Sequence, residues 1–189
     1  MRRSSALSLP NILTYARIAA VGFVTLFYFV PSLESRWVAV GIYIAAAITD
    51  FFDGYLARAW QQQSALGRML DPIADKLLVS TCLLLMAADG TISGVSIVAA
   101  IVILCREILV SGLREFLAEL RVSVPVTRMA KWKTTMQLVA VGVLLAGPAG
   151  DRLMPYTTDI GLVLLWVSAL LTIYTGWDYF RAGIDHLVD

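Results

Sequence analysis

Long apolar runs dominate this chain of 189 residues and limit what it can fold into. Hydrophobic residues make up 59% of the sequence and charged residues 15%, whereas soluble domains average about 45–50% and about 25%. A membrane-spanning helix needs about 20 mostly apolar residues. The runs are continuous rather than alternating, which favours helices over a barrel. We therefore predict one all-α domain over 1–189, a six-transmembrane-helix integral membrane bundle with spans near 10–30, 37–58, 72–88, 94–117, 130–147 and 160–181.

The distribution of basic residues predicts the orientation of the spans. Loops between spans that face the cytoplasm carry an excess of Lys and Arg. The loops after the first, third and fifth spans carry only Arg36 and Arg152, whereas the remaining loops, the termini and the adjacent helix ends hold most of the basic residues. Both termini are therefore expected in the cytoplasm. No nucleic-acid partner is expected.

Four aspartates occur at helical spacing around the end of the second span. Asp50 and Asp53 are three residues apart, and Asp71 and Asp75 are four apart, so each pair shares one face of a helix. The first pair ends one span and the second opens the next, and a short loop joins them. Two antiparallel helices would therefore bring four carboxylates to one point in the cytoplasmic third of the bilayer.

Carboxylates at this depth are costly, which makes a functional role the default reading. Hard divalent cations prefer oxygen ligands, and four carboxylates can hold two ions about 3.5–4 Å apart, a geometry that clamps a phosphoryl group. Gly54 and Ala57 follow on the same helix and allow a ligand to approach closely, and Arg58 can pair with a phosphate. The pattern indicates a metal-dependent membrane enzyme.

Plainer interpretations exist for parts of this pattern. Asp71 precedes Pro72 and would serve as a helix N-cap if the third span began there. Asp50 and Asp53 would also suit structural ion pairs or a cation path in a carrier. The two cysteines, Cys82 and Cys105, have no metal-ligand spacing and are interpreted as small buried apolar residues.

The complete frame D-x2-D-G-x2-A-R-x8-G-x3-D-x3-D, from Asp50 to Asp75, resembles the signature of the CDP-alcohol phosphotransferase family at every fixed position. The segment from Leu9 to Thr14 with Arg17 is similar to the family's first helix. Three further segments look like its bacterial phosphatidylglycerophosphate synthase branch: CREILVSGLREF (105–116), KWKTTMQ (131–137) and YTGWDYFRAG (174–183). Cys105 stands where glycine is expected and Ser64 where threonine is common.

The resemblance implies a six-helix, homodimeric enzyme of the bacterial inner membrane with its active site on the cytoplasmic side. It would transfer the phosphatidyl group from CDP-diacylglycerol to sn-glycerol 3-phosphate and release CMP. It implies Mg2+ or Mn2+ as a pair of divalent ions, with Asp75 also acting as the base because the spans offer no histidine. The implied metal ligands are Asp50, Asp53, Asp71 and Asp75.

The resemblance also implies where the two substrates bind. CDP-diacylglycerol would contact Asn11, Thr14, Gly54, Ala57, Arg58 and Ser64. The phosphate of the acceptor needs cations, and the candidates are Arg106, Arg114, Lys131 and Lys133. Arg106 and Arg114 lie eight residues apart on one predicted span and can face one cavity. The competing interpretations are a buried pair of Arg106 with Glu107, although adjacent helical residues do not face each other, and positive-inside anchoring by the two lysines.

Other functions stay open at this point. Another member of the same family would take inositol phosphate, serine or phosphatidylglycerol as its acceptor, and the cationic set favours a phosphorylated one. In a carboxylate-lined ion or solute carrier, the fixed spacing of Gly54, Ala57 and Arg58 after the aspartates would have no necessary role. An aspartate-rich prenyl-transferring enzyme would carry DDxxD clusters, which are absent from the sequence.

Overall fold

Six helices make up the part of the chain that the computed structural model describes. It describes residues 9–59, 65–120, 122 and 128–184, with side chains for all of these except 10, 51–59, 65, 66, 68, 128, 130, 131 and 182–184. The helices are α1 (Leu9–Phe29), α2 (Leu33–Ala59), α3 (Ala65–Ala88), α4 (Ser96–Glu119), α5 (Arg128–Asp151) and α6 (Thr157–Ile184). The predicted all-α class with six helices is confirmed.

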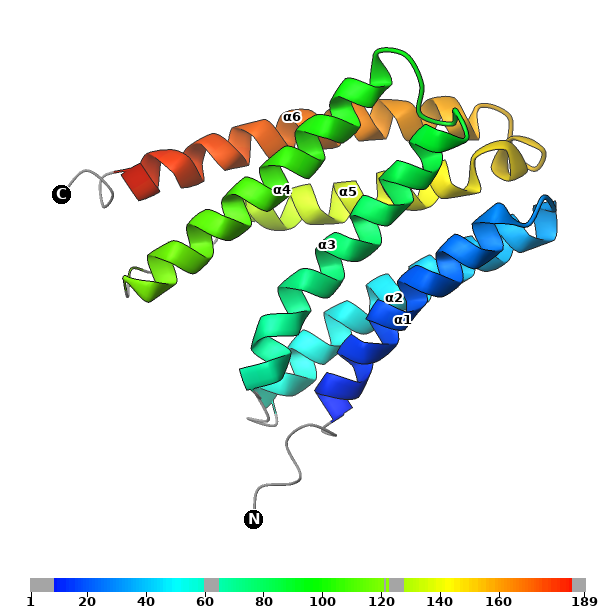
Figure 1. The fold of residues 1–189 in the computed structure, drawn as a ribbon. Coiled ribbons are helices and arrows are strands. Elements are labelled where there is room, and N and C mark those ends of the chain that lie inside the picture. Colours follow the sequence, from blue (N-terminus) through cyan, green and yellow to red (C-terminus); the bar gives the residue numbers. More distant parts are fainter. Residues whose placement is uncertain (1–8, 60–64, 121, 123–127, 185–189) are drawn as a thin grey trace.

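The helices form two groups that α3 joins. α1 and α2 lie side by side, and α6 packs against both α4 and α5 (Figure 1). α3 contacts α1 on one side and α4 and α5 on the other, while α2 also contacts α5. The fully buried core draws on every helix, and its largest apolar members include Val24, Tyr43, Leu83, Met86, Ile103, Leu144 and Leu165.

Small residues let α5 and α6 approach closely. A Cβ on Gly161 of α6 would lie 2.7 Å from Cγ of Leu144 on α5. Contacts of this kind are typical of helices that associate within a membrane, where van der Waals packing replaces the hydrophobic effect as the driving force.

Large apolar side chains are exposed on all six helices, as a lipid-facing surface requires. Examples are Phe23 on α1, Ile48 on α2, Leu84 on α3, Ile108 on α4, Val139 on α5 and Leu170 on α6. Within the described residues, three segments are long and apolar enough to cross a membrane by length and composition alone: Asn11–Phe29, Ser96–Glu119 and Thr157–Arg181. α3 falls short because Asp71, Asp75 and Lys76 lie within it. The protein is thus a helical membrane protein.

Two details of the sequence analysis need correction. α3 begins at Ala65, so Pro72 and Asp71 lie inside the helix and Asp71 is not its N-cap. Pro72 is compatible with a first helical turn, but the helix starts about two turns earlier and accommodates this proline inside it. Cys82 is buried as expected, but Cys105 is exposed, because an apolar run in a membrane helix includes the side chains that face lipid.

A polar cluster connects four elements at the end of the bundle where α2 begins. Arg36 pairs with Asp89 at 2.8 Å and donates to Tyr28 Oη at 2.7 Å, to Thr91 Oγ1 at 3.1 Å and to the carbonyl of Leu145 at 3.0 Å. The backbone kinks next to that carbonyl at Gly147, whose φ is 41°. A Cβ there would lie 3.2 Å from Nη2 of Arg36, so glycine fits both the conformation and the space.

Candidate active site

All six helices contribute to one polar cavity of about 700 Å3. One side chain from each is Arg17 (α1), Asp50 (α2), Asp75 (α3), Arg106 (α4), Lys133 (α5) and Tyr179 (α6). The lining combines an acidic cluster on α2 and α3 with a basic cluster on α4 and α5. A cavity that needs every helix agrees with a single functional unit.

The acidic cluster contains Asp50, Asp71 and Asp75, all on the cavity lining. Nη1 of Arg17 lies 2.7 Å from Oδ1 of Asp50 and 2.9 Å from Oδ1 of Asp75. The Arg17 side chain is 1% exposed, whereas that of Asp75 is 50% exposed. The buried guanidinium thus holds the carboxylates of Asp50 and Asp75 close together, and Asp75 stays accessible from the cavity.

Thr14 supports the third carboxylate. Its hydroxyl donates to Oδ1 of Asp71 at 2.5 Å, and the residue is buried. Asn11, one turn earlier on α1, is also buried. Neither belongs to the cavity lining, so in this structure Thr14 acts on Asp71 rather than facing the space that a nucleotide would occupy.

The donor set fits hard divalent cations by its chemistry, since carboxylate oxygens from two neighbouring helices line the same cavity. Among the described side chains, no group of three His, Cys, Asp or Glu is arranged closely enough to hold a metal ion. Asp53 lies one turn after Asp50 on α2, but its side chain is outside the described part. The metal ligands therefore stay a prediction.

The basic cluster contains Arg106, Arg114 and Lys133, as the sequence analysis expected for a cavity that takes an anion. α6 orients both arginines: Arg106 Nη2 donates to Thr175 Oγ1 at 3.1 Å, and Arg114 Nη2 to Tyr179 Oη at 3.4 Å. Gly176 makes room for Arg106, because a Cβ there would lie 3.1 Å from the Cγ of Arg106. Nε of Arg106 is buried and has no hydrogen-bond partner among the described residues.

Glu107 also borders the cavity, inside the basic cluster. Its Oε1 accepts a hydrogen bond from Nζ of Lys133 and lies 3.5 Å from Nη1 of Arg106. The expectation that neighbours on a helix do not pair is therefore only partly right, because these two side chains are long enough to meet at their ends. Arg106 nevertheless faces the cavity.

Several predicted site residues fall outside the described side chains. Gly54, Ala57 and Arg58 lie along α2 and Lys131 in the first turn of α5, with only their helical backbone described; Ser64 is outside the described residues altogether. Their proposed contacts stay predictions.

Sequence reasoning missed several residues that build the site. Arg17 entered only through the resemblance, although a charged residue within an apolar run is itself a signal. Thr175 and Tyr179 lie four apart on α6, within a row of buried polar residues that also includes Ser168 and Thr172. That row is visible in the sequence, but nothing there says which helix it faces.

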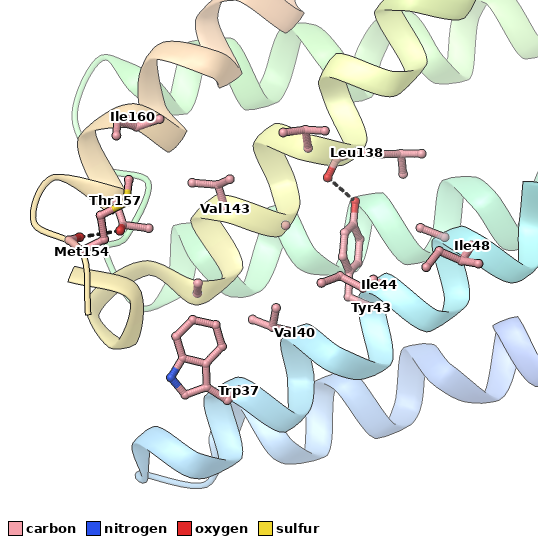
Figure 2. Close-up of a pocket in the computed structure, with 14 residues that line it drawn as sticks. Trp37, Val40, Tyr43, Ile44, Ile48, Leu138, Val143, Met154, Thr157 and Ile160 are labelled. Atoms are coloured by element: carbon pink, nitrogen blue, oxygen red, sulfur yellow. Dashed lines mark hydrogen bonds between the residues drawn. The ribbon is translucent and has the colours of Figure 1, made fainter. Parts of the chain in front are cut away.

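An apolar groove of about 800 Å3 adjoins the polar cavity. Ala47 and Leu138 line both spaces, so the groove is continuous with the site. Figure 2 shows its two walls, with Trp37, Val40, Tyr43, Ile44 and Ile48 on α2 facing Leu138 and Val143 on α5. The Tyr43 hydroxyl donates to the carbonyl of Leu138 at 3.1 Å and ties the walls together.

The groove ends near the start of α6, at Met154, Thr157 and Ile160. From Ile48 to Trp37 it follows α2 for eleven residues, or about 16 Å at about 1.5 Å per residue. Its walls are almost entirely apolar, so it suits a hydrocarbon chain.

Fold and site together define a helical membrane protein whose carboxylates and cations share one cavity. A sequence model of the CDP-alcohol phosphatidyltransferase family matches residues 7–174. The chain belongs to this family.

The chain is also similar to individual members over nearly its whole length. It is 46% identical to a protein of Rickettsia bellii over 93% of this chain and 94% of the relative. It is 39% identical to one of Cereibacter sphaeroides (96% and 98%) and 35% identical to one of Haemophilus influenzae (96% and 96%). Each of these relatives is named CDP-diacylglycerol–glycerol-3-phosphate 3-phosphatidyltransferase.

Proposed function

We propose that this protein is a phosphatidylglycerophosphate synthase, which transfers the phosphatidyl group of CDP-diacylglycerol to sn-glycerol 3-phosphate and releases CMP. One observation carries the proposal: an acidic cluster, a basic cluster and an apolar groove meet at the same cavity. The reaction needs these three surfaces, for a diphosphate with its metal ions, for a phosphorylated acceptor and for an acyl chain.

The diphosphate of the lipid substrate would lie beside the aspartates. Asp50, Asp53, Asp71 and Asp75 are the residues that would hold two divalent ions, Mg2+ or Mn2+. When bound, such ions neutralise the diphosphate and stabilise the charge on the departing CMP. Arg17 keeps Asp50 and Asp75 directed to the same point, and Thr14 does the same for Asp71.

Asp75 is the proposed base. A glycerol hydroxyl is a poor nucleophile near neutral pH, and a positioned carboxylate can accept its proton as it attacks. A bond then forms between this oxygen and the phosphorus next to diacylglycerol, while the bond from that phosphorus to the CMP oxygen breaks. The Asp75 side chain lines the cavity and is 50% exposed, so an alcohol can reach it.

Arg106, Arg114 and Lys133 would hold the phosphate of the acceptor, with Lys131 as a further candidate. A phosphomonoester carries about −1.5 to −2 near pH 7, and arginine pairs with phosphate through several hydrogen bonds. The partnerless buried Nε of Arg106 is one donor that an anion could satisfy. The contacts from α6 fix both guanidinium groups before the substrate arrives, which lowers the entropy lost on binding.

The apolar groove would take one acyl chain of CDP-diacylglycerol. Its wall residues belong to α2 and α5 and lead away from the aspartates, so the headgroup can sit in the cavity while the chain stays in apolar surroundings. We further propose a homodimer in the bacterial inner membrane, with both termini and the cavity on the cytoplasmic side, as the distribution of Lys and Arg predicts.

The test is CMP release by the protein purified in detergent micelles with CDP-diacylglycerol and a panel of acceptors: glycerol 3-phosphate, inositol phosphate, serine and phosphatidylglycerol. We expect release with glycerol 3-phosphate and its loss on adding EDTA. Faster release with another acceptor would move the chain to a different branch of the family, and no release with any acceptor would favour a carrier.

A further inference from the structure

We infer that Glu107 is a positioning residue of the acceptor site, which places Lys133 and sets the charge of the basic cluster to match a phosphomonoester. The inference rests on the proposed function of that cluster. Glu107 is an acidic residue among three cations, and a carboxylate by itself repels an anionic substrate. Its contacts give it a physical role.

Lys133 cannot keep its place without a counter-charge. Its side chain is 6% exposed, and a buried ammonium group is strongly unfavourable unless it is paired and hydrogen-bonded. Among the described residues, the ion pair that the structure gives Lys133 is the one with Glu107. Without this carboxylate, the lysine would turn to solvent or lose its proton, and the cavity would lose a cation.

The ion pair also joins two helices at the cavity. Glu107 is on α4 and Lys133 is on α5, and each of these helices packs extensively on α6. Packing on α6 therefore holds the arginines of α4 and the lysine of α5 near each other. The contact between Glu107 and Lys133 adds a direct link between α4 and α5. Arg106 and Arg114 also have hydroxyl partners, Thr175 and Tyr179. Glu107 contacts Arg106 only at 3.5 Å, so its main partner is Lys133.

The charges of the cluster then sum to a useful value. Arg106, Arg114 and Lys133 contribute three positive charges and Glu107 one negative charge, which leaves +2. A phosphomonoester carries about −1.5 to −2 near pH 7. The cluster with Glu107 therefore neutralises such an acceptor, whereas the three cations alone would exceed its charge and hold each other apart.

A double-mutant cycle on Glu107 and Lys133 tests this role. Wild type, Glu107→Gln, Lys133→Met and the double variant are compared for KM with glycerol 3-phosphate and KM with CDP-diacylglycerol. We expect each single variant to raise the acceptor KM about tenfold, which corresponds to about 1.4 kcal/mol, and to leave the lipid KM within about twofold. Since Glu107 acts through Lys133, the double variant should match Lys133→Met.

Glu119→Gln is the matched control, because Glu119 is an exposed glutamate on the same helix outside the cavity. Thermal melting in micelles shows which variants fold. If Glu107→Gln alone fails to fold, Glu107→Asp takes its place: the shorter carboxylate no longer reaches Lys133, so the acceptor KM should rise while the lipid KM stays within about twofold, and an unchanged acceptor KM would overturn the role.

Three results would overturn the inference: an unchanged acceptor KM in Glu107→Gln, effects that multiply in the double variant, or a parallel rise in both KM values. The activity of the wild type distinguishes this failure from failure of the proposed function. If the wild type releases no CMP with glycerol 3-phosphate, the proposed function itself fails. If the wild type releases CMP but the effects of the two substitutions on the acceptor KM multiply, only the role of Glu107 is wrong.

Discussion

Arg17 on α1 and Asp75 on α3 form an ion pair of 2.9 Å at the floor of the polar cavity, although 58 residues separate them in the chain. The same guanidinium nitrogen contacts Asp50 on α2 at 2.7 Å. A single buried cation thus fixes the relative positions of the first three helices where the aspartates converge. This arrangement gives the proposed base a defined orientation and motivates the first prediction.

Replacing Asp75 by Asn should abolish turnover and leave the binding of CDP-diacylglycerol largely intact. The amide keeps the shape of the side chain but accepts no proton, and a general base contributes about 10²–10⁴ in rate. CMP release and equilibrium binding of the lipid are the two measurements. Asp159→Asn, at an exposed aspartate near the start of α6, is the control. Full activity in Asp75→Asn would remove this residue from the base role.

Arg106→Ala and Arg114→Ala should raise KM for glycerol 3-phosphate by about 10- to 100-fold each, since a hydrogen bond to a charged group is worth about 1.5–3 kcal/mol. KM for CDP-diacylglycerol should change much less, because the proposed place of the lipid headgroup is beside the aspartates of α2 and α3. Arg152→Ala, an exposed arginine outside the cavity, should behave like wild type. Equal effects on both substrates would indicate a structural role for the arginines.

Filling the apolar groove should change the preference for acyl chains. Gly142 lines the groove, and a Cβ there would lie 3.4 Å from the Tyr43 ring, so Gly142→Leu would occupy the space of several methylene groups. We expect kcat/KM to fall more for long-chain than for short-chain CDP-diacylglycerol, with an unchanged KM for the acceptor. Gly41→Leu, at an exposed glycine of α2 with open space around it, is the control. Equal losses for all chain lengths would contradict acyl binding in the groove.

The cluster around Asp89 should make stability depend on pH. Partial burial would raise the pKa of this carboxyl, but hydrogen bonds from Tyr28, Thr91 and Arg36 outweigh it and hold the pKa below the ordinary 3.8. A carboxyl with a lowered folded-state pKa stabilises the protein above its unfolded pKa, and this contribution is lost as the pH falls through the folded value. The melting temperature of the wild type should therefore fall below about pH 4.

Asp89→Asn isolates this contribution. The variant should be less stable than wild type at pH 7, because the amide leaves Arg36 without its charge partner, and the difference should shrink towards pH 3. A constant difference between the two proteins over this range would rule out the proposed linkage.

The sequence predicted the parts of this structure that depend on periodicity and hydropathy. Asp50, Asp71 and Asp75 share a cavity because helical spacing and a short connection put them there. Arg106 and Arg114 both face it because eight residues leave them only about 80° apart around the helix. The start of α3 differs from the prediction because Pro72, typical of a first helical turn, lies inside this helix. Cys105 was placed inside because an apolar run does not distinguish protein contact from lipid contact.

Contacts between helices that are distant in the chain could not be predicted from the sequence. The pairing of Arg17 with two aspartates, of Glu107 with Lys133 and of Thr175 with Arg106 depends on which faces of six helices meet. The groove beside the cavity has the same origin, since Ile44 and Val143 belong to helices far apart in the chain and their separation is set by packing. Periodicity gives the faces of a helix but not its neighbours.

The binding of divalent ions by the aspartates is tested most directly by titrating the metal-free protein with Mn2+ and following free Mn2+ by electron paramagnetic resonance, without any substrate. The proposed site of four carboxylates predicts about two bound ions per chain and markedly weaker binding in Asp50→Asn and Asp71→Asn, with Asp159→Asn unchanged. Absence of Mn2+ binding in wild type, or equal binding in all three variants, would contradict a metal centre at these residues.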